Sequence, residues 1–174
     1  MITEQKNVLL FLEAVALLKK EYNGRFCIDW YGGMKNQYYL EKCRVRIKEL
    51  DISDVFRLCL PVKDIDKIYP QYHFFCLPSI YEGFPNVVCE AMASGLPVAV
   101  SNICDNPNIV SEGEDGVLFN PNNLNDIASA LKKLLNISFK ELAEMGAKAR
   151  EKIIKQNSKE SFTNKYIELI ESLK

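Results

Sequence analysis

Two glutamates are the side chains of this sequence that are best placed to do chemistry. Glu82 follows an apolar segment that is predicted to be a strand, and Glu90 comes eight residues later, inside a predicted helix. Carboxylates accept hydrogen bonds from hydroxyl groups such as those of a sugar. The helix dipole also favours carboxylates near a helix start, so the spacing alone is more typical of a solvated surface than of a site.

The segment between the two glutamates can supply hydrogen-bond donors. Gly83 allows backbone to come close to a ligand, and Pro85 suits the first helical position, where its missing N–H costs nothing. The amides from Asn86 onward are expected to point out of the helix N-terminus, where they can bind phosphate or a polar sugar edge. A sugar attached to a nucleotide diphosphate needs both kinds of group: carboxylates that accept hydrogen bonds from its hydroxyls, and amides that donate to its phosphate oxygens.

Strand-like and helix-like segments alternate along the whole chain. Apolar runs predict strands at 26–31, 55–60, 74–77, 97–100 and 117–119. Apolar spacings of three and four predict helices at 8–20, 40–50, 65–69, 86–94 and 124–135, after Ser138, and at about 159–173. Asn7 is expected to cap the first helix, Gly95 to end the fourth, and Ser138 and Glu141 to form a capping box.

Strands that are apolar throughout are covered on both faces, which indicates a parallel sheet between helix layers. The fold class is therefore α/β, a Rossmann-like, doubly wound parallel sheet. In such sheets ligands bind beyond the carboxyl ends of the strands, which is where Glu82 is expected.

Composition limits the range of functions. The chain has 174 residues, 48% hydrophobic and 26% charged, which fits one well-buried domain over residues 1–174 and excludes a disordered protein. With a net charge of −1, the chain has no strong electrostatic field that would attract nucleic acid or a membrane surface. Six cysteines without CxxC pairs indicate reduced thiols in the cytoplasm rather than a disulfide framework or a zinc site.

Other candidate residues favour simpler interpretations. His73 starts a predicted strand, far from its carboxyl end, and is expected to be a core or edge residue. Gly32 and Gly33 lack the third glycine of a dinucleotide fingerprint, which argues against NAD. Ser79 and Ser94 have no paired base that would make a hydrolase, and no cluster indicates a bound metal.

The run LPSIYEGFPNVVCEAMASGLPVAVS, from Leu77 to Ser101, resembles the signature of the retaining, family-4 (group 1) glycosyltransferases of the GT-B fold. Glu82 and Glu90 match the two acids of that family's E-x7-E motif. The start of the chain resembles a family segment in which a lysine contacts the donor diphosphate, and Lys6 is the matching residue.

The resemblance implies the donor-binding, C-terminal half of such an enzyme. Glu82 would lie beside the sugar ring, Lys6 would stabilise the departing diphosphate, and Glu90 would bind ribose hydroxyls. The donor-binding positions that it implies are Cys59, Leu60, Gly83, Phe84, Asn86, Val87 and Glu90. The nucleotide diphosphate sugar is the donor substrate, and no cofactor or metal is implied, because positive charge and amides stabilise the leaving group.

The sequence also departs from the family pattern. The acceptor-binding N-terminal domain is absent, and the family's first strand and its diphosphate arginine would fall at or before Met1, so we expect a chain truncated at its N-terminus. The edge left by that strand favours self-association. Asn108 stands where the family usually has glutamate, which predicts a different role for that loop or a different donor.

These observations together predict the donor-binding domain of a retaining glycosyltransferase that transfers a sugar to a hydroxyl acceptor. The chain alone is expected to be inactive, and the longer enzyme to be cytoplasmic or peripheral at the inner membrane face. Two alternatives stay open, a non-catalytic module that binds nucleotide sugars and a fragment of a sugar-nucleotide epimerase.

Overall fold

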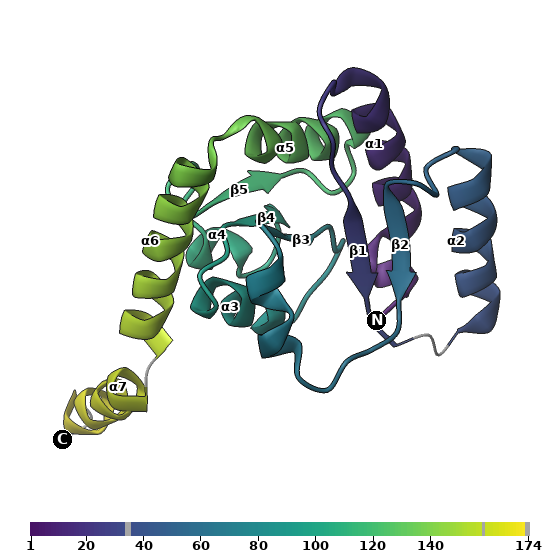
Figure 1. The fold of residues 1–174 in the computed structure, drawn as a ribbon. Helices are drawn as coiled ribbons and strands as arrows, with labels where there is room; N and C mark the ends of the chain where they lie inside the picture. Colours follow the sequence, from purple (N-terminus) through teal and green to yellow (C-terminus); the bar gives the residue numbers. More distant parts are fainter. Residues whose placement is uncertain (34–35, 158, 173–174) are drawn as a thin grey trace.

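The computed structural model describes residues 1–33, 36–157 and 159–172. Parallel strands alternate with helices, as Figure 1 shows. The strands are β1 (Ile28–Tyr31), β2 (Phe56–Cys59), β3 (Phe75–Leu77), β4 (Val98–Ser101) and β5 (Gly116–Phe119). The α-helices are α1 (Val8–Glu21), α2 (Gln37–Glu49), α3 (Asn86–Ala93), α4 (Asn106–Ile109), α5 (Leu124–Asn136), α6 (Phe139–Asn157) and α7 (Lys159–Ser172). Short 3-10 helices are η1 (Glu4–Lys6), η2 (Ile65–Lys67) and η3 (Tyr69–Gln71).

The strands form two parallel sheets. β1 pairs with β2, and β3, β4 and β5 pair in that order, so the α/β class and the parallel pairing predicted from the sequence are confirmed. Among the described residues no ladder joins β1 to β3, and the sheet is divided at that point (Figure 1).

All five predicted strands form, and each boundary lies within two residues of the prediction. The predicted helix at 65–69 is instead two 3-10 turns, η2 and η3, and the short helix α4 was not predicted. The capping box at the start of α6 is confirmed, because Ser138 N–H and Oγ–H both donate to Glu141 and Glu141 N–H donates back to Ser138 Oγ. Gly95 ends α3 with a φ of +83°, as expected.

The expectation that Asn7 caps α1 through its side chain is wrong. Asn7 does precede α1, but it has a left-handed φ of 56° and its side chain makes no capping hydrogen bond. Its Nδ2 instead donates to the carbonyl oxygen of Pro121, at 2.7 Å. The side chain thus ties the start of α1 to the segment before α5, a contact that local sequence does not encode.

Helix α1 anchors the core between the two sheets. Its residues Phe11, Val15 and Leu18, at spacings of three and four, are buried. The ring of Phe11 meets Trp30 of β1 and Phe56 of β2 edge-on, with centroids 5.6 and 6.3 Å apart. Because α1 also packs along α5, which covers the other sheet, these two helices hold the sheets together on one face.

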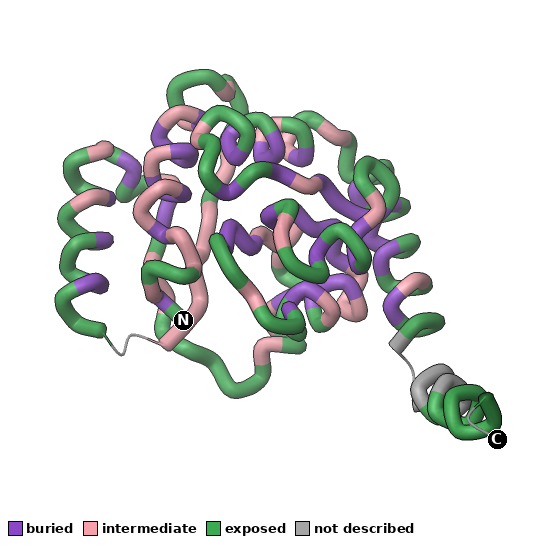
Figure 2. The backbone as a smooth tube through the Cα atoms, turned by 180° about the vertical axis from the view of Figure 1, so that it is seen from behind, coloured by how far each residue is buried: buried purple, intermediate pink, exposed green. Residues whose placement is uncertain are grey.

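Of the two C-terminal helices, only α7 leaves this body. α6 packs against α3, and α7 then extends away from the sheets, as Figures 1 and 2 show. Figure 2 also shows buried residues concentrated along β4 and β5. Within the described ranges, no helix has the length and apolar character needed to cross a membrane.

Candidate functional site

The site is built around an ion pair between Lys6 and Glu82. Lys6 ends η1 and Glu82 lies in the loop after β3, and Lys6 Nζ contacts Glu82 Oε1. The two side chains are only 15% and 10% exposed. Buried Ser79 donates its hydroxyl to the same Oε1 at 2.5 Å. Since water is largely excluded, these charge-assisted bonds fix the Glu82 carboxylate more firmly than a surface pair would.

Backbone contacts bring Lys6 and Glu82 together. Ile80 N–H donates to Gln5 O at 2.9 Å, and the Gln5 side-chain amide donates to Tyr81 O at 2.9 Å. These two bonds hold η1 against the loop that follows β3. The carboxyl end of β1 meets the same N-terminal segment, because Ile2 N–H donates to Gly33 O at 2.9 Å. The segments that follow β1 and β3 are therefore both held by the same N-terminal segment, and Glu82 lies beyond the carboxyl end of β3.

The N-terminus of α3 lies beside this pair and offers fewer free amides than predicted. Pro85 precedes α3 and provides no side-chain cap. Asn86 N–H donates to Phe84 O at 3.0 Å and Val88 N–H donates to Pro85 O at 2.9 Å, so both are already used within the turn. The N–H of Val87 has no partner among the described residues. The prediction that the amides from Asn86 onward are free is thus wrong for Asn86 and Val88.

Gly83 and Phe84 leave open space in front of the helix. A Cβ added at Gly83 would meet nothing within 4 Å, and its φ is not left-handed, so the loop conformation does not require glycine. The Phe84 side chain is exposed. The loop is therefore open on the side of Gly83, and a close approach of its backbone to a ligand stays a prediction.

Glu90 belongs to a second contact, with Tyr69. Glu90 lies on the exposed surface of α3, and the hydroxyl of Tyr69 donates to its Oε2 at 3.5 Å. Tyr69 is buried in η3, and burial together with the nearby carboxylate raises the pKa of Tyr69 to about 12. Tyr69 therefore stays protonated as a donor to Glu90. Sequence reasoning missed this residue, because an aromatic in an apolar run is usually a core residue.

Cys59 and Leu60 lie at the carboxyl end of β2, in the other sheet. Cys59 is half-buried, and burial raises the pKa of its thiol, whereas the Leu60 side chain is exposed. Both residues share the edge of the molecule at which β1 ends. They make no hydrogen bond or ion pair to Lys6, Glu82 or Glu90 in the described part of the chain, so a role near a nucleotide base stays a prediction.

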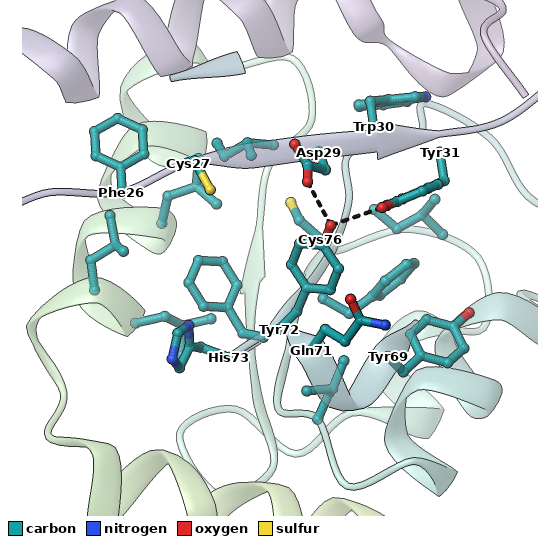
Figure 3. Close-up of a pocket in the computed structure, with 18 of the residues that line it drawn as sticks. Phe26, Cys27, Asp29, Trp30, Tyr31, Tyr69, Gln71, Tyr72, His73 and Cys76 are labelled. Carbon is teal, nitrogen blue, oxygen red and sulfur yellow. Dashed lines mark hydrogen bonds between the residues drawn. The ribbon is translucent and has the colours of Figure 1, made fainter. Parts of the chain in front are cut away.

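A cavity of about 1000 Å³ lies between β1 and β3 (Figure 3). Tyr72 reaches across it, and its hydroxyl donates to Asp29 at 2.6 Å and lies 3.0 Å from the hydroxyl of Tyr31. Arg57 also donates to Asp29, at 2.6 Å. Burial acts to raise the pKa of Asp29, but these hydrogen bonds outweigh it and the pKa is lowered.

The cavity is adjacent to the predicted site and is not the same space. Of the predicted site residues, only Lys6 and Val87 line it. His73 also lines the cavity, and its ring lies 5.1 Å from the ring of Phe139. Because His73 is exposed, it is an edge residue and not a core residue. No sequence signal identified this cavity, because it arises from the division of the sheet.

Comparison with known proteins matches residues 1–152 to the family described as glycosyl transferases group 1. The chain is 30% identical over 142 residues to the O-antigen chain mannosyltransferase B of Escherichia coli, covering 80% of this chain and 36% of that protein. It is 29% identical over 169 residues to the poly(ribitol-phosphate) alpha-N-acetylglucosaminyltransferase of Staphylococcus aureus, covering 96% of this chain and 33% of that protein.

Solved structures share the fold over nearly the full chain. A variant of TarM from S. aureus, crystallised with Fondaparinux, alpha-GlcNAc-glycerol and UDP, is 27% identical, with a TM-score of 0.83, covering 97% of this chain and 33% of that chain. A glycosyltransferase from Rickettsia africae is 20% identical, with a TM-score of 0.88, covering 97% of this chain and 44% of that chain. The chain spans about a third of the length of the two curated relatives.

Proposed function

This chain belongs to the group 1 glycosyltransferases, and from that membership we propose that it is the part of such an enzyme that binds the nucleotide diphosphate sugar. One observation carries the proposal: the Lys6–Glu82 pair lies at the edge where strands end, next to the N-terminus of α3. A cation, a carboxylate and a helix start are complementary to a diphosphate that carries a polyhydroxylated sugar.

Lys6 would bind the diphosphate. Its ammonium group has three donors, and the contact with Glu82 uses one of them. A phosphate oxygen can take a second donor without breaking the pair. As the bond between the sugar and the diphosphate breaks, negative charge grows on the leaving oxygen, and a fixed cation in a site with little water stabilises that charge. Lys6 and the N–H of Val87 would then supply the stabilisation for which other enzymes use a metal.

Glu82 and Glu90 would bind hydroxyl groups. The contacts of Ser79 and Lys6 are both with Oε1 of Glu82, which leaves Oε2 to accept a bond from the sugar. Glu90 is exposed on one side and bonded to Tyr69 on the other, which suits a carboxylate that accepts two ribose hydroxyls. Binding both ends of the donor would position the anomeric carbon for attack.

The comparisons support a nucleotide diphosphate sugar as the ligand. The TarM variant was crystallised with UDP, and the two curated relatives are named for the transfer of mannose and of N-acetylglucosamine. For the longer enzyme we infer transfer of a sugar to a hydroxyl acceptor with retention of configuration, in the cytoplasm or at the inner membrane face. The acceptor would bind to a part of the enzyme that this chain does not contain, and we expect no turnover by this chain alone.

Calorimetric titration of the purified chain with UDP, GDP and ADP tests the proposal. We expect saturable binding of one nucleotide, weakened about tenfold or more by Lys6→Met, since a charge-assisted hydrogen bond is lost. Lys20→Met, which removes an exposed lysine at the end of α1, is the matched control and should bind as the unmodified chain does. Binding that is equal in all three proteins, or sugar transfer by this chain alone, would contradict the proposal.

A further inference from the structure

Ser79 and Glu82 have the same spacing in the sequence as Ser138 and Glu141, which form the capping box of α6. In a capping box the backbone N–H groups of both residues also bond to the partner's side chain. Neither backbone bond joins Ser79 to Glu82 in the described part of the chain, and the next helix begins only at Asn86. The bond from the Ser79 hydroxyl to Glu82 is therefore not a helix cap.

Ser101 shows a simpler way in which the fold satisfies a buried serine at a strand end. It ends β4, is fully buried, and donates its hydroxyl to the carbonyl oxygen of Leu77 at 3.3 Å. Ser79 follows the neighbouring strand β3 and is equally buried, but its hydroxyl donates to a carboxylate at 2.5 Å. Hydrogen bonds to an ionised acceptor are shorter and stronger than neutral ones. The Ser79 hydroxyl is thus committed to Glu82.

The two oxygens of the Glu82 carboxylate have different surroundings. Oε1 accepts hydrogen bonds from Ser79 and Lys6, whereas Oε2 has no hydrogen-bond partner among the described residues. The buried side-chain oxygens without a partner in that part of the chain are Thr3 Oγ1 and Asn106 Oδ1, so Oε2 of Glu82 is open to solvent. One oxygen is held inside the fold, and the other is free to accept a hydrogen bond from a ligand.

Lys6 alone would not fix which oxygen of Glu82 faces outward. A terminal carboxylate rotates about a broad, two-fold torsion, so its two oxygens exchange places easily. The Lys6 ammonium group is a point charge on a flexible stem, and its donors can follow either oxygen. Ser79 has a short side chain that is enclosed by the fold, so the position of its hydroxyl is constrained. Ser79 therefore selects one orientation of the carboxylate.

The backbone that carries Glu82 is held separately. The two residues before it bond to Gln5, through Ile80 N–H to the Gln5 carbonyl oxygen and through the Gln5 side-chain amide to the Tyr81 carbonyl oxygen, both at 2.9 Å. These bonds place the start of the Glu82 side chain, but they do not touch its carboxylate. The orientation of the carboxylate thus depends on the two donors at Oε1, and of these only Ser79 is rigidly placed.

We propose that Ser79 is a positioning residue of the donor site, whose hydroxyl holds Oε1 of Glu82 so that Oε2 is presented to a hydroxyl of the donor sugar. This role rests on the proposed function, in which Lys6 binds the diphosphate and Glu90 the ribose. Ser79 should therefore affect the binding of the sugar and leave the binding of the nucleotide unchanged. A merely structural role would weaken both, because distortion of the loop after β3 disturbs Lys6 as well as Glu82.

The test compares Ser79→Ala with two matched serine variants of the full chain. Ser101→Ala removes an equally buried hydroxyl that bonds to backbone, and Ser138→Ala removes a hydroxyl that bonds to a glutamate outside the site. Calorimetry measures the affinity of each protein for UDP, GDP and ADP and for UDP-glucose, GDP-mannose and ADP-glucose. For the base that binds, the ratio of the two affinities separates the contribution of the sugar from that of the nucleotide.

We expect Ser79→Ala to weaken binding of the sugar conjugate by about fivefold or more, because the acceptor of the sugar hydroxyl loses its orientation. Its affinity for the free nucleotide should change by less than about twofold, and the two control variants should change the ratio by less than about twofold. Equal losses for the sugar conjugate and the free nucleotide in Ser79→Ala would show a structural role and overturn the proposal. An unchanged affinity for the sugar conjugate would overturn it as well.

The carboxyl carbon resonance of Glu82, recorded by NMR without ligand, tests the hold of Ser79 on Glu82 independently of nucleotide binding. The resonance is assigned from its absence in Glu82→Gln. We expect it to shift in Ser79→Ala and to stay in place in Ser101→Ala, whereas Ser138→Ala should shift the resonance of Glu141 instead. An unmoved Glu82 resonance in Ser79→Ala would overturn the proposal. A shifted resonance in a chain that binds none of the nucleotides would contradict the proposed function and support the positioning of Glu82 by Ser79.

Discussion

Lys6 and Glu82 are 76 residues apart in the chain and form an ion pair, with both side chains largely buried and Ser79 bonded to the same carboxylate oxygen. The pair joins the N-terminal 3-10 turn η1 to the loop after β3. It therefore links the two ends of the candidate site, the cation that would bind a diphosphate and the carboxylate that would bind a sugar. The contribution of this ion pair to the free energy of unfolding and its contribution to nucleotide binding can be measured separately.

Replacing Lys6 by methionine should destabilise the fold as well as weaken nucleotide binding. The substitution leaves the Glu82 carboxylate in a site with little water and no opposite charge, which costs about 2–3 kcal/mol in the free energy of unfolding. Adding Glu82→Gln to Lys6→Met should restore part of that loss, because the uncompensated charge is then gone. Urea denaturation of the single and double variants measures the coupling, and fully additive effects would show that the pair contributes nothing.

Tyr69 should act through Glu90. Tyr69→Phe keeps the ring that packs in the core and removes the hydroxyl that donates to Glu90, so we expect a loss of about 1 kcal/mol in stability. Nucleotide affinity should fall by about threefold to tenfold, because Glu90 loses its orientation. Glu90→Ala should weaken binding at least as much, and Tyr69→Phe should add little in that background. Glu144→Ala, on the exposed surface of α6, is the control glutamate.

Asp29 should make the fold sensitive to acid. Its pKa lies below the ordinary value of 3.8, because hydrogen bonds from Arg57 and Tyr72 outweigh the opposing effect of burial. A carboxyl group with a lowered pKa in the folded state stabilises the fold above its unfolded-state pKa, and that contribution is lost as the pH falls through the folded-state pKa. The stability difference between the unmodified chain and Asp29→Asn should therefore be constant from pH 5 to 7 and shrink below about pH 4.

Gly146 should be intolerant of any side chain. A Cβ at this position would lie 2.0 Å from the carbonyl oxygen of Gly95, where α6 crosses the end of α3. The higher helix propensity of alanine is worth only about 1 kcal/mol, so the clash with backbone should dominate and Gly146→Ala should destabilise the fold by about 1–3 kcal/mol. Gly83→Ala is the matched control, because a Cβ added at Gly83 would meet nothing within 4 Å. The thermal midpoint of this variant should equal that of the unmodified chain.

Much of the local structure could be predicted because it depends on neighbouring residues. Apolar runs located all five strands, and the Ser138 to Glu141 spacing predicted the capping box that starts α6. Gly95 was predicted to end α3 because a residue without a Cβ adopts a left-handed φ at little cost. The residues from Leu77 to Ser101 likewise identified the family, since they carry its signature in one continuous segment.

Contacts between distant segments could not be predicted in the same way. Asn7 bonds to the Pro121 carbonyl and not to its own helix, and Tyr69 meets Glu90, because η3 and α3 pack together in the folded chain. The pairing of Lys6 with Glu82 and the cavity between β1 and β3 also result from packing between distant segments. Spacing along the sequence determines which face of a helix or strand is apolar, whereas the tertiary packing of those faces decides which side chains meet and which strand edges stay open.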